Sequence, residues 1–247
     1  MKLYKKLTLS ITTLACVLSL ASCNDNKKEE NGFKNIGNEV TQEEIIALYA
    51  DASAAMYEHE GDFTNTIDGN CGSVLGDRGE KIYSNSLLVI EYDSDSKIYK
   101  ESSDYEYTAS LDKTVEKTVT YECQISDYVR YIDEIEKTYY DDFYATFNPK
   151  AEYDSYLENA NFGTIISDEY YSGYKYYANN NVFTVTADDE LVSGKIQIQF
   201  YDDLVVYLMD VEATFDGQTT SETVKFTISF KNVKLDPIDV TNYTRKD

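Results

Sequence analysis

Apolar and polar residues alternate along much of the chain after residue 81. Seven segments carry this pattern or a short apolar run: 87–92, 105–111, 119–125, 182–185, 196–200, 205–215 and 224–230. A period of two gives a strand one apolar and one polar face. Short hydrophilic turns follow several of these segments, for example at 93–96 and 216–217. The pattern therefore predicts an antiparallel sheet that is wetted on one side, and it argues against a parallel α/β core.

A helical period precedes the strands. Thr41 and Glu44 have the spacing of a capping box, which marks the start of a helix. The apolar positions that follow lie at helical spacing: Ile45, Leu48, Ala52, Ala55 and Met56. Gly61 ends the pattern, so we expect one amphipathic helix that packs on the sheet. A second helix is predicted from Asn148-Pro149 to about residue 161, whereas 128–147 mixes both periods and stays unassigned.

The N-terminus has the layout of an export signal. Lys2, Lys5 and Lys6 form a basic start, and an apolar run covers 7–20. Fourteen helical residues span about 21 Å, which is short of the ~30 Å hydrocarbon core. The run is therefore an export signal and not a membrane-spanning helix.

The signal ends in Leu20-Ala21-Ser22-Cys23, which resembles the lipobox of bacterial lipoproteins. The resemblance implies that Cys23 receives a diacylglyceryl thioether and that cleavage occurs before it. Residues 1–22 would then be the signal peptide, 23–40 a lipidated flexible tether, and 41–247 a single antiparallel β domain with an N-terminal helix. The protein would sit on the outer face of the cytoplasmic membrane. The alternative is an ordinary signal peptide that happens to contain a cysteine.

The charge balance limits the kinds of partner. The precursor has 247 residues with 22 Lys+Arg against 45 Asp+Glu, and removal of 1–22 takes away three lysines, which leaves a net charge of −26. Such a body is repelled by nucleic-acid phosphates, which bind through clustered Lys and Arg. It is also repelled by anionic headgroups. We therefore expect no nucleic-acid partner, and membrane attachment that depends on the two acyl chains at Cys23.

Two cysteines remain after Cys16 leaves with the signal and Cys23 takes the lipid. Cys71 and Cys123 are an even pair in an exported chain, so they are a candidate disulfide. The bond would close a loop of about 50 residues, which corresponds to around 4 kcal/mol in the chain-entropy model. The alternative is two buried thiols, which behave as small apolar side chains.

The whole arrangement resembles the LolA/LppX-like lipoproteins. The most similar part is the closing stretch, with 194–200, the Asp202-Asp203 turn, the strand to Phe215, 224–230 and Pro237. This resemblance implies an α+β, mainly β fold in which a curved antiparallel sheet, a half-barrel, packs on one or two helices. It also implies an apolar cavity that binds a hydrophobic ligand such as a lipid.

The apolar strand faces allow two interpretations. They either pack fully against the N-terminal helix or line a cavity that admits an acyl chain, and the alternation is the same in both cases. The candidate lining residues are Leu48, Met56, Val205, Tyr207, Met209, Val211, Phe226 and Ile228.

Tyrosine is abundant, with 24 residues in the chain. Aromatic platforms stack on sugars or line a groove for a partner, and the candidate surface patch is Tyr170, Tyr171, Tyr174 and Tyr177. The alternative function is therefore an acidic, Tyr-rich protein- or glycan-interaction or adhesion module with a filled core. Strand propensity alone also accounts for many tyrosines.

No catalytic motif accompanies these features. His59 is the single histidine, and the chain contains neither GxSxG nor HExxH. Acidic pairs such as Asp93/Asp95 and Asp202/Asp203 fall where hairpin turns are expected. We therefore expect a non-enzymatic protein without a metal or cofactor.

Overall fold

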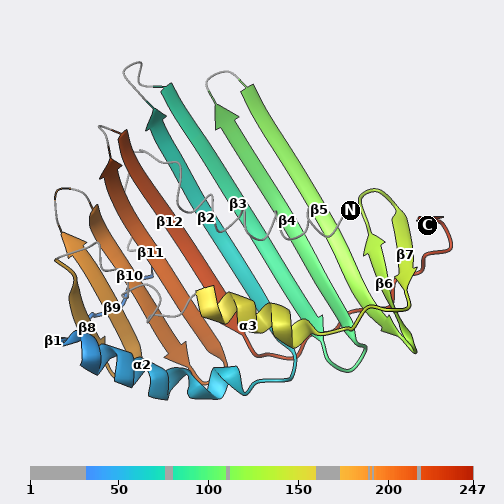
Figure 1. Ribbon diagram of the computed structural model, residues 1–247, viewed down its shortest axis with the longest axis horizontal. Helices are drawn as coiled ribbons and strands as arrows, with labels where there is room; N and C mark the ends of the chain where they lie inside the picture. The colour runs from blue at the N-terminus through green and yellow to red at the C-terminus, as the bar shows by residue number, and fades with distance from the viewer. Residues whose placement is uncertain are drawn as a thin grey trace.

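The sheet is the dominant feature of the molecule. The computed structural model describes residues 32–75, 80–109, 112–159, 173–188, 190, 192–215 and 218–246. Within these residues the chain forms one open, curved sheet and two short helices (Figure 1). The prediction of a mainly β fold with a curved sheet and one or two helices is confirmed.

Thirteen strands have been placed in the described ranges, in the spatial order β1-β8-β9-β10-β11-β12-β2-β3-β4-β5-β6-β7-β13. The pairing of β13 with β7 is parallel, and the other described pairs are antiparallel. The strands are β1 (Asn38–Val40), β2 (Phe63–Leu75), β3 (Glu80–Asp93), β4 (Ile98–Ala109), β5 (Asp112–Ile125), β6 (Tyr128–Asp133), β7 (Thr138–Asp142), β8 (Lys175–Asn179), β9 (Val182–Asp188), β10 (Val192–Tyr201), β11 (Leu204–Phe215), β12 (Gln218–Ser229) and β13 (Thr244–Arg245). The helices are α2 (Gln42–Tyr57) and α3 (Pro149–Asn159).

Two meanders meet in the middle of the sheet. Strands β2–β7 follow one another on one half and β8–β12 on the other. The last long strand, β12, pairs with β2, so Ile228 lies opposite Asn65 and Phe226 lies opposite Ile67. Residues about 160 positions apart in the sequence therefore form the centre of the sheet.

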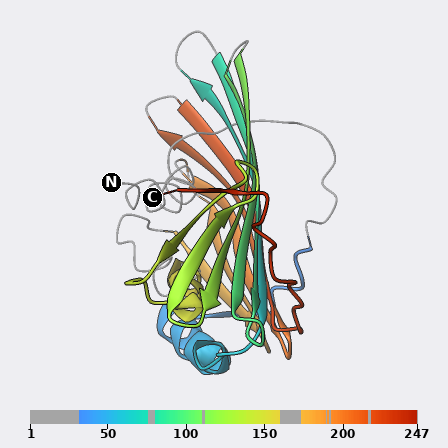
Figure 2. The same ribbon diagram turned by 90° about the vertical axis from the view of Figure 1, so that its right-hand side faces the viewer.

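The two faces of the sheet carry different segments. Both helices lie on one face, which we call the helix-side face (Figure 2). The chain after β12 and residues 32–37 lie on the opposite face, which we call the back face (Figure 2). Directly opposed residues in paired strands point to the same side, so the register assigns each strand residue to one of these faces.

Helix α2 begins as the sequence predicts. Thr41 Oγ1 accepts from the Glu44 backbone N–H at 3.2 Å, and Glu44 Oε2 accepts from the Thr41 backbone N–H at 2.8 Å. The capping box is confirmed. Ile45, Tyr49 and Met56 are buried on the sheet side of this helix.

Leu48 is a correction to the predicted stripe. Its side chain is 45% exposed, whereas Ile45 is 0% exposed. The buried line of α2 runs through Ile45, Tyr49 and Met56, and Leu48 is rotated away from this line. At 3.6 residues per turn, a wide predicted stripe includes positions at its edge that reach the solvent.

Helix α3 supports the other end of the core. Asn148 Oδ1 accepts from the Ala151 backbone N–H at 3.3 Å, which caps the helix as predicted. Tyr153 is 2% exposed and its hydroxyl donates to the Met56 carbonyl at 3.0 Å. This bond links the two helices. Most of the unassigned segment 128–147, residues 128–142, forms the hairpin of β6 and β7.

The start of the fold lies earlier than predicted. Strand β1 pairs with β8, with Val40 opposite Tyr176, and residues 32–37 contact the back face through Gln197 and Gln199. Residues 32–40 of the predicted tether, 23–40, therefore belong to the fold. Residues 23–31, including Cys23, lie outside the described residues.

Candidate functional site

Four of the predicted cavity residues belong to a packed core. Met56, Val205, Phe226 and Ile228 are all at most 7% exposed. They pack in one cluster with Ile45, Tyr49, Phe63, Phe183 and Phe200. Beneath α2, therefore, the space between helix and sheet is filled by side chains.

The other three predicted lining residues continue the apolar face beyond this core. Tyr207, Met209 and Val211 are half-buried. They are successive helix-side residues of β11, and Met209 lies opposite Val224 of β12. The strands extend past α2 and α3 toward the upper end of the sheet in Figure 1. The apolar strip of β11 and β12 therefore leads away from the helices.

Two polar side chains on the helix-side face mark the ends of this strip. Asn65 is 1% exposed, and neither its Nδ2 nor its Oδ1 has a hydrogen-bond partner among the described residues. Glu222, 8% exposed, lies opposite Cys71 of β2 and Val211 of β11. Asn65 and Cys71 are six residues apart, which is about 20 Å along a strand. We call the surface between Asn65 and Glu222 the apolar strip.

Burial changes the acid–base behaviour of the strip. Burial raises the pKa of Glu222 from 4.5 to about 8, so the carboxylic acid is largely protonated at neutral pH. A protonated carboxyl can donate a hydrogen bond as well as accept one. The pKa of Tyr207 is also raised, first by burial and then by Glu222. The Tyr207 hydroxyl donates to Met209 Sδ at 3.7 Å.

Replacing Glu222 is expected to remove a pH dependence of stability. The folded-state pKa of about 8 lies above the ordinary 4.5, so the stability contribution is fully present below about pH 4.5 and is lost as the pH rises toward 8. One pKa unit corresponds to about 1.4 kcal/mol, so we expect Glu222→Gln to be more stable than the wild type by about 2 kcal/mol or more at pH 8.5. The two should converge near pH 5 in urea titrations.

Glu116 supplies the matched control, because it is an exposed glutamate of β5 on the helix-side face, the same face as Glu222. Glu116→Gln should differ from the wild type by a constant, small amount at every pH. A difference for Glu222→Gln that does not grow with pH would contradict the burial of an ionisable Glu222.

The predicted disulfide is not present. Cys71 lies on β2 and Cys123 on β5, with β3 and β4 between them, and the structure does not join them. Their side chains also point to opposite faces, because Cys71 lies opposite Glu222 whereas Cys123 lies opposite Ile98 on the back face. No bridge forms between such positions. Cys123 packs with Ile98 and Ile132, and burial raises the pKa of its thiol to about 11.

The predicted tyrosine patch is also corrected. Tyr170 and Tyr171 lie outside the described residues. Tyr174 packs against the helix-side core, whereas Tyr177 points to the back face, since it neighbours Tyr176 and Tyr176 packs on that core. Tyr174 precedes β8, and alternation along β8 places Tyr177 on the opposite face from Tyr176, so Tyr174 and Tyr177 do not share one surface.

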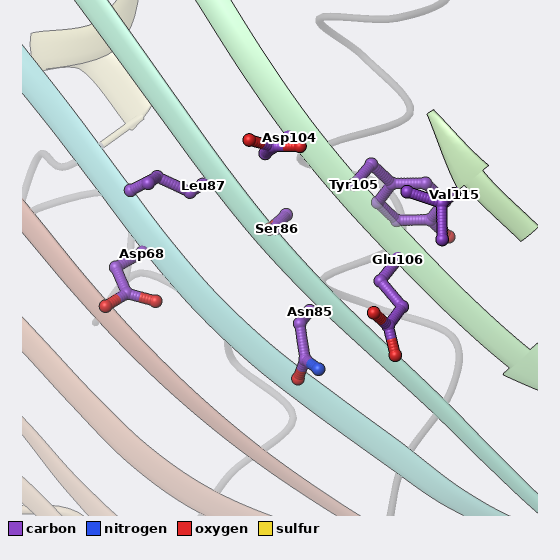
Figure 3. A pocket seen from close by; sticks show the side chains of 8 residues that line it. All are labelled: Asp68, Asn85, Ser86, Leu87, Asp104, Tyr105, Glu106 and Val115. Carbon is purple, nitrogen blue, oxygen red and sulfur yellow. The ribbon is translucent and has the colours of Figure 1, made fainter. Parts of the chain in front are cut away.

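A groove that the sequence analysis missed lies on the back face. Side chains of β2–β5 line a groove of about 240 Å³ (Figure 3). Its polar rim contains Asp68, Asn85, Asp104 and Glu106, and its apolar part contains Leu87 and Val115. Asp104 pairs with Lys117 at 2.6 Å, and Glu106 pairs with Lys113 at 2.8 Å. These lining residues occupy alternate positions on neighbouring strands. The sequence could have indicated the groove only if the pairing register of these strands had been known.

The described part of the chain contains no group of three or more His, Cys, Asp or Glu residues that could hold a metal ion. His59 Nε2 lies 2.9 Å from the Asp62 carbonyl, and the ring centroid lies 4.6 Å from that of Phe230. The histidine is thus half-buried beside the core. In the same described ranges, no helix is long and apolar enough to cross a bilayer.

Known proteins add little to this description. No protein-family model matches the chain, and no curated protein sequence matches it. Among solved structures, the chain is similar to the S-type phycobiliprotein lyase CPES from Guillardia theta, with 10% sequence identity and a TM-score of 0.25 over 74% of this chain and 94% of that chain. A likeness at this level assigns no function.

Proposed function

We propose that this protein is a bacterial lipoprotein, anchored by lipid on Cys23 at the outer face of the cytoplasmic membrane, that binds a hydrophobic ligand on the helix-side face. It is not an enzyme in this proposal, and its fold is related to the LolA/LppX-like group. The ligand is an acyl chain with a polar end, bound along the apolar strip between Asn65 and Glu222.

The observation that carries this proposal is the amide of Asn65. A buried amide without a hydrogen-bond partner costs about 1–3 kcal/mol, and native proteins keep few such groups. The amide lies 1% exposed among Phe63, Ile90 and Ile228 of the helix-side core. A ligand whose polar end group displaced the side chains around the amide would provide the missing partner.

The length of the strip supports an acyl ligand. It measures about 20 Å along β2, and one leaflet of a bilayer core, roughly one acyl chain, is about 15 Å thick. Met209, Val211 and Val224 are the half-buried apolar side chains along it. Glu222, protonated at neutral pH, provides a neutral hydrogen-bonding group at the far end.

The direct test is extraction of the purified full-length protein followed by mass spectrometry, together with displacement of a fluorescent fatty acid. We expect a co-purified lipid and saturable displacement. Absence of both a bound lipid and any saturable binding would contradict the proposal.

Asn65→Val separates the ligand role of the amide from its role in folding. Because the variant removes an unsatisfied buried amide, we expect the ligand-free protein to be more stable by about 1–2 kcal/mol. We also expect at least tenfold weaker binding of the fatty-acid probe. Asn85→Val is the matched control, since Asn85 is exposed on the back face. A stabilised Asn65→Val that binds as tightly as the wild type would exclude Asn65 from the site.

The second candidate function is an acidic interaction module with a filled core, which binds a protein or a glycan. The packed cluster beneath α2 favours it, because that part of the helix-side face offers no space for a ligand. Such a module would bind no fatty-acid probe and would tolerate Asn65→Val without loss of partner binding. The displacement experiment therefore decides between the two.

A further inference from the structure

Residues 32–37 are fastened to the back face by buried glutamines. Gln197 Oε1 accepts from the Lys34 backbone N–H at 2.7 Å, and Gln197 Nε2 donates to the Lys34 carbonyl at 3.1 Å. Gln199 Nε2 donates to the Gly32 carbonyl at 3.1 Å. The two glutamine side chains are 0% and 2% exposed. We call these two side chains and the backbone that they hold the glutamine clasp.

The clasp is a built site and not an incidental contact. Gln197 Nε2 also donates to Thr184 Oγ1 at 2.9 Å, and Gln199 Nε2 donates to Gln197 Oε1 at 2.7 Å, so both amides are oriented by neighbours. Buried amides satisfied in this way contribute to stability, and without the N-terminal segment these hydrogen bonds would be replaced by bonds to water. The segment therefore stays on β9–β11 in the folded protein.

The attachment of Gly32 limits the distance between the back face and a lipid on Cys23. Nine residue steps separate the two residues, and a fully extended chain of that length reaches about 30 Å. To turn the helix-side face toward the bilayer, this chain would have to pass from β10 around β9, β8 and β1, at about 4.8 Å per strand, and then past a helix layer of about 10 Å. That path takes about 24 Å, so it uses most of the reach of about 30 Å.

Charge favours the same orientation. In β2–β5 and β8–β12, the register places every lysine with a described side chain on the back face: Lys100, Lys113, Lys117, Lys175, Lys195 and Lys225. Acidic residues stand among them, so this face is of mixed charge without a net positive excess: Asp68, Glu91, Asp93, Asp104, Glu106, Asp188, Asp210 and Glu212. The helix-side positions of β4 and β5 carry Glu101, Glu116 and Glu122, and α2 contains three acidic residues and no basic residue. Anionic headgroups therefore repel the helix-side face more strongly.

We infer that the back face of the β8–β12 half is the membrane-proximal surface of the anchored protein, held facing the phospholipid headgroups by the lipid anchor and the glutamine clasp, and that the helix-side face is turned away from the bilayer. This inference rests on the lipid anchor of the proposed function, and not on its ligand. The proposed ligand strip would then open toward the outside of the cell.

The test uses full-length protein purified from bacterial membranes and reconstituted in vesicles of phosphatidylcholine with phosphatidylglycerol. In a Cys71→Ser background, an environment-sensitive dye is placed by Asp210→Cys on the back face or by Asp51→Cys on α2. Both positions are exposed and both changes remove one aspartate. A nitroxide on the lipid headgroup then quenches the dye at short range. We expect at least twofold more quenching at position 210 than at position 51.

Opening the clasp should abolish this difference. Gln197→Ala/Gln199→Ala frees residues 32–37 and so lengthens the unattached chain between the lipid and the sheet. Both positions should then be quenched equally. Gln124→Ala, a glutamine on β5 far from the clasp, should keep the difference. If the double variant does not fold, twelve Gly/Ser residues inserted between Asn31 and Gly32 lengthen the chain between the lipid and the sheet while the clasp stays intact. The difference in quenching between positions 210 and 51 should then shrink.

The outcomes separate the two proposals. Protein that does not float with vesicles would overturn the lipid anchor and the orientation together. Vesicle-bound protein with equal or reversed quenching at the two positions would overturn the orientation alone.

Discussion

Phe183→Ala is expected to lower the free energy of unfolding by about 3–5 kcal/mol, as large-to-small changes of buried aromatic residues do. Phe183 of β9 is 1% exposed. Its ring centroid lies 6.0 Å from that of Tyr49 on α2 and 5.8 Å from that of Phe200 on β10, both in edge-on arrangements. Removal of the ring would leave a cavity at the point where helix and sheet meet. Urea titration followed by circular dichroism measures the loss.

Val115→Ala is the control for this prediction. Val115 is 61% exposed on the back face of β5, so the change should alter stability by less than about 0.5 kcal/mol. A small effect for Phe183→Ala would mean that the core beneath α2 is not packed as described. In that case the space between α2 and the sheet could collapse or hold a ligand.

The local patterns predicted the regular elements well. The segments 205–215 and 224–230 correspond to β11 (Leu204–Phe215) and the second half of β12 (Gln218–Ser229). The capping box at Thr41 and Glu44 fixes the start of α2. These signals work because alternation and capping depend on neighbouring residues, which sequence alone displays.

Strand β2 shows where this approach fails. Its sequence contains Asn65, Gly69, Asn70 and Gly72, which are residue types depleted in strands. It nevertheless lies at the centre of the sheet, paired with β12 on one side and β3 on the other. Pairing on both edges overrides weak propensity, and the β12 partner is about 160 residues away. No local pattern could have revealed it.

The glutamine clasp was hidden for a similar reason. Gln197 and Gln199 occupy the polar positions of an alternating strand, so the pattern assigns them to the solvent. They are buried because a polar segment from the N-terminus covers them. That segment has the composition of a flexible tether, and hydrogen bonds from the side-chain amides of β10 hold its backbone in place.

The candidate ligand site was predicted in part. Tyr207, Met209 and Val211 were named, whereas Asn65 and Glu222 look like ordinary polar residues of a strand.

Asp93→Ala is expected to lower the free energy of unfolding by about 3 kcal/mol. Asp93 is 3% exposed, and its Oδ1 accepts from the backbone N–H groups of Asp95 and Ser96 at 3.0 and 3.1 Å. Its Oδ2 accepts from the Leu235 N–H at 2.9 Å, which attaches the chain after β12 to the back face. Bonds to a charged acceptor contribute about 1.5–3 kcal/mol each, and the loss leaves several donors unpaired.

Acid should weaken the same contact in the wild type. The Leu235 N–H is the largest cause that lowers the pKa of Asp93, from 3.8 to about 2. A lowered carboxyl pKa gives stability that is present above about pH 4 and lost as the pH falls toward 2. The difference in the free energy of unfolding between the wild type and Asp93→Ala, measured in urea titrations, should therefore narrow between pH 5 and pH 2.5.

Asp95→Ala is the control in the same turn, because Asp95 is exposed and lies 3.8 Å from Lys234 in a surface ion pair. This change should lower the free energy of unfolding by less than about 0.5 kcal/mol. Equal losses for the two aspartates would show that the turn, and not the attachment of Leu235, determines the effect.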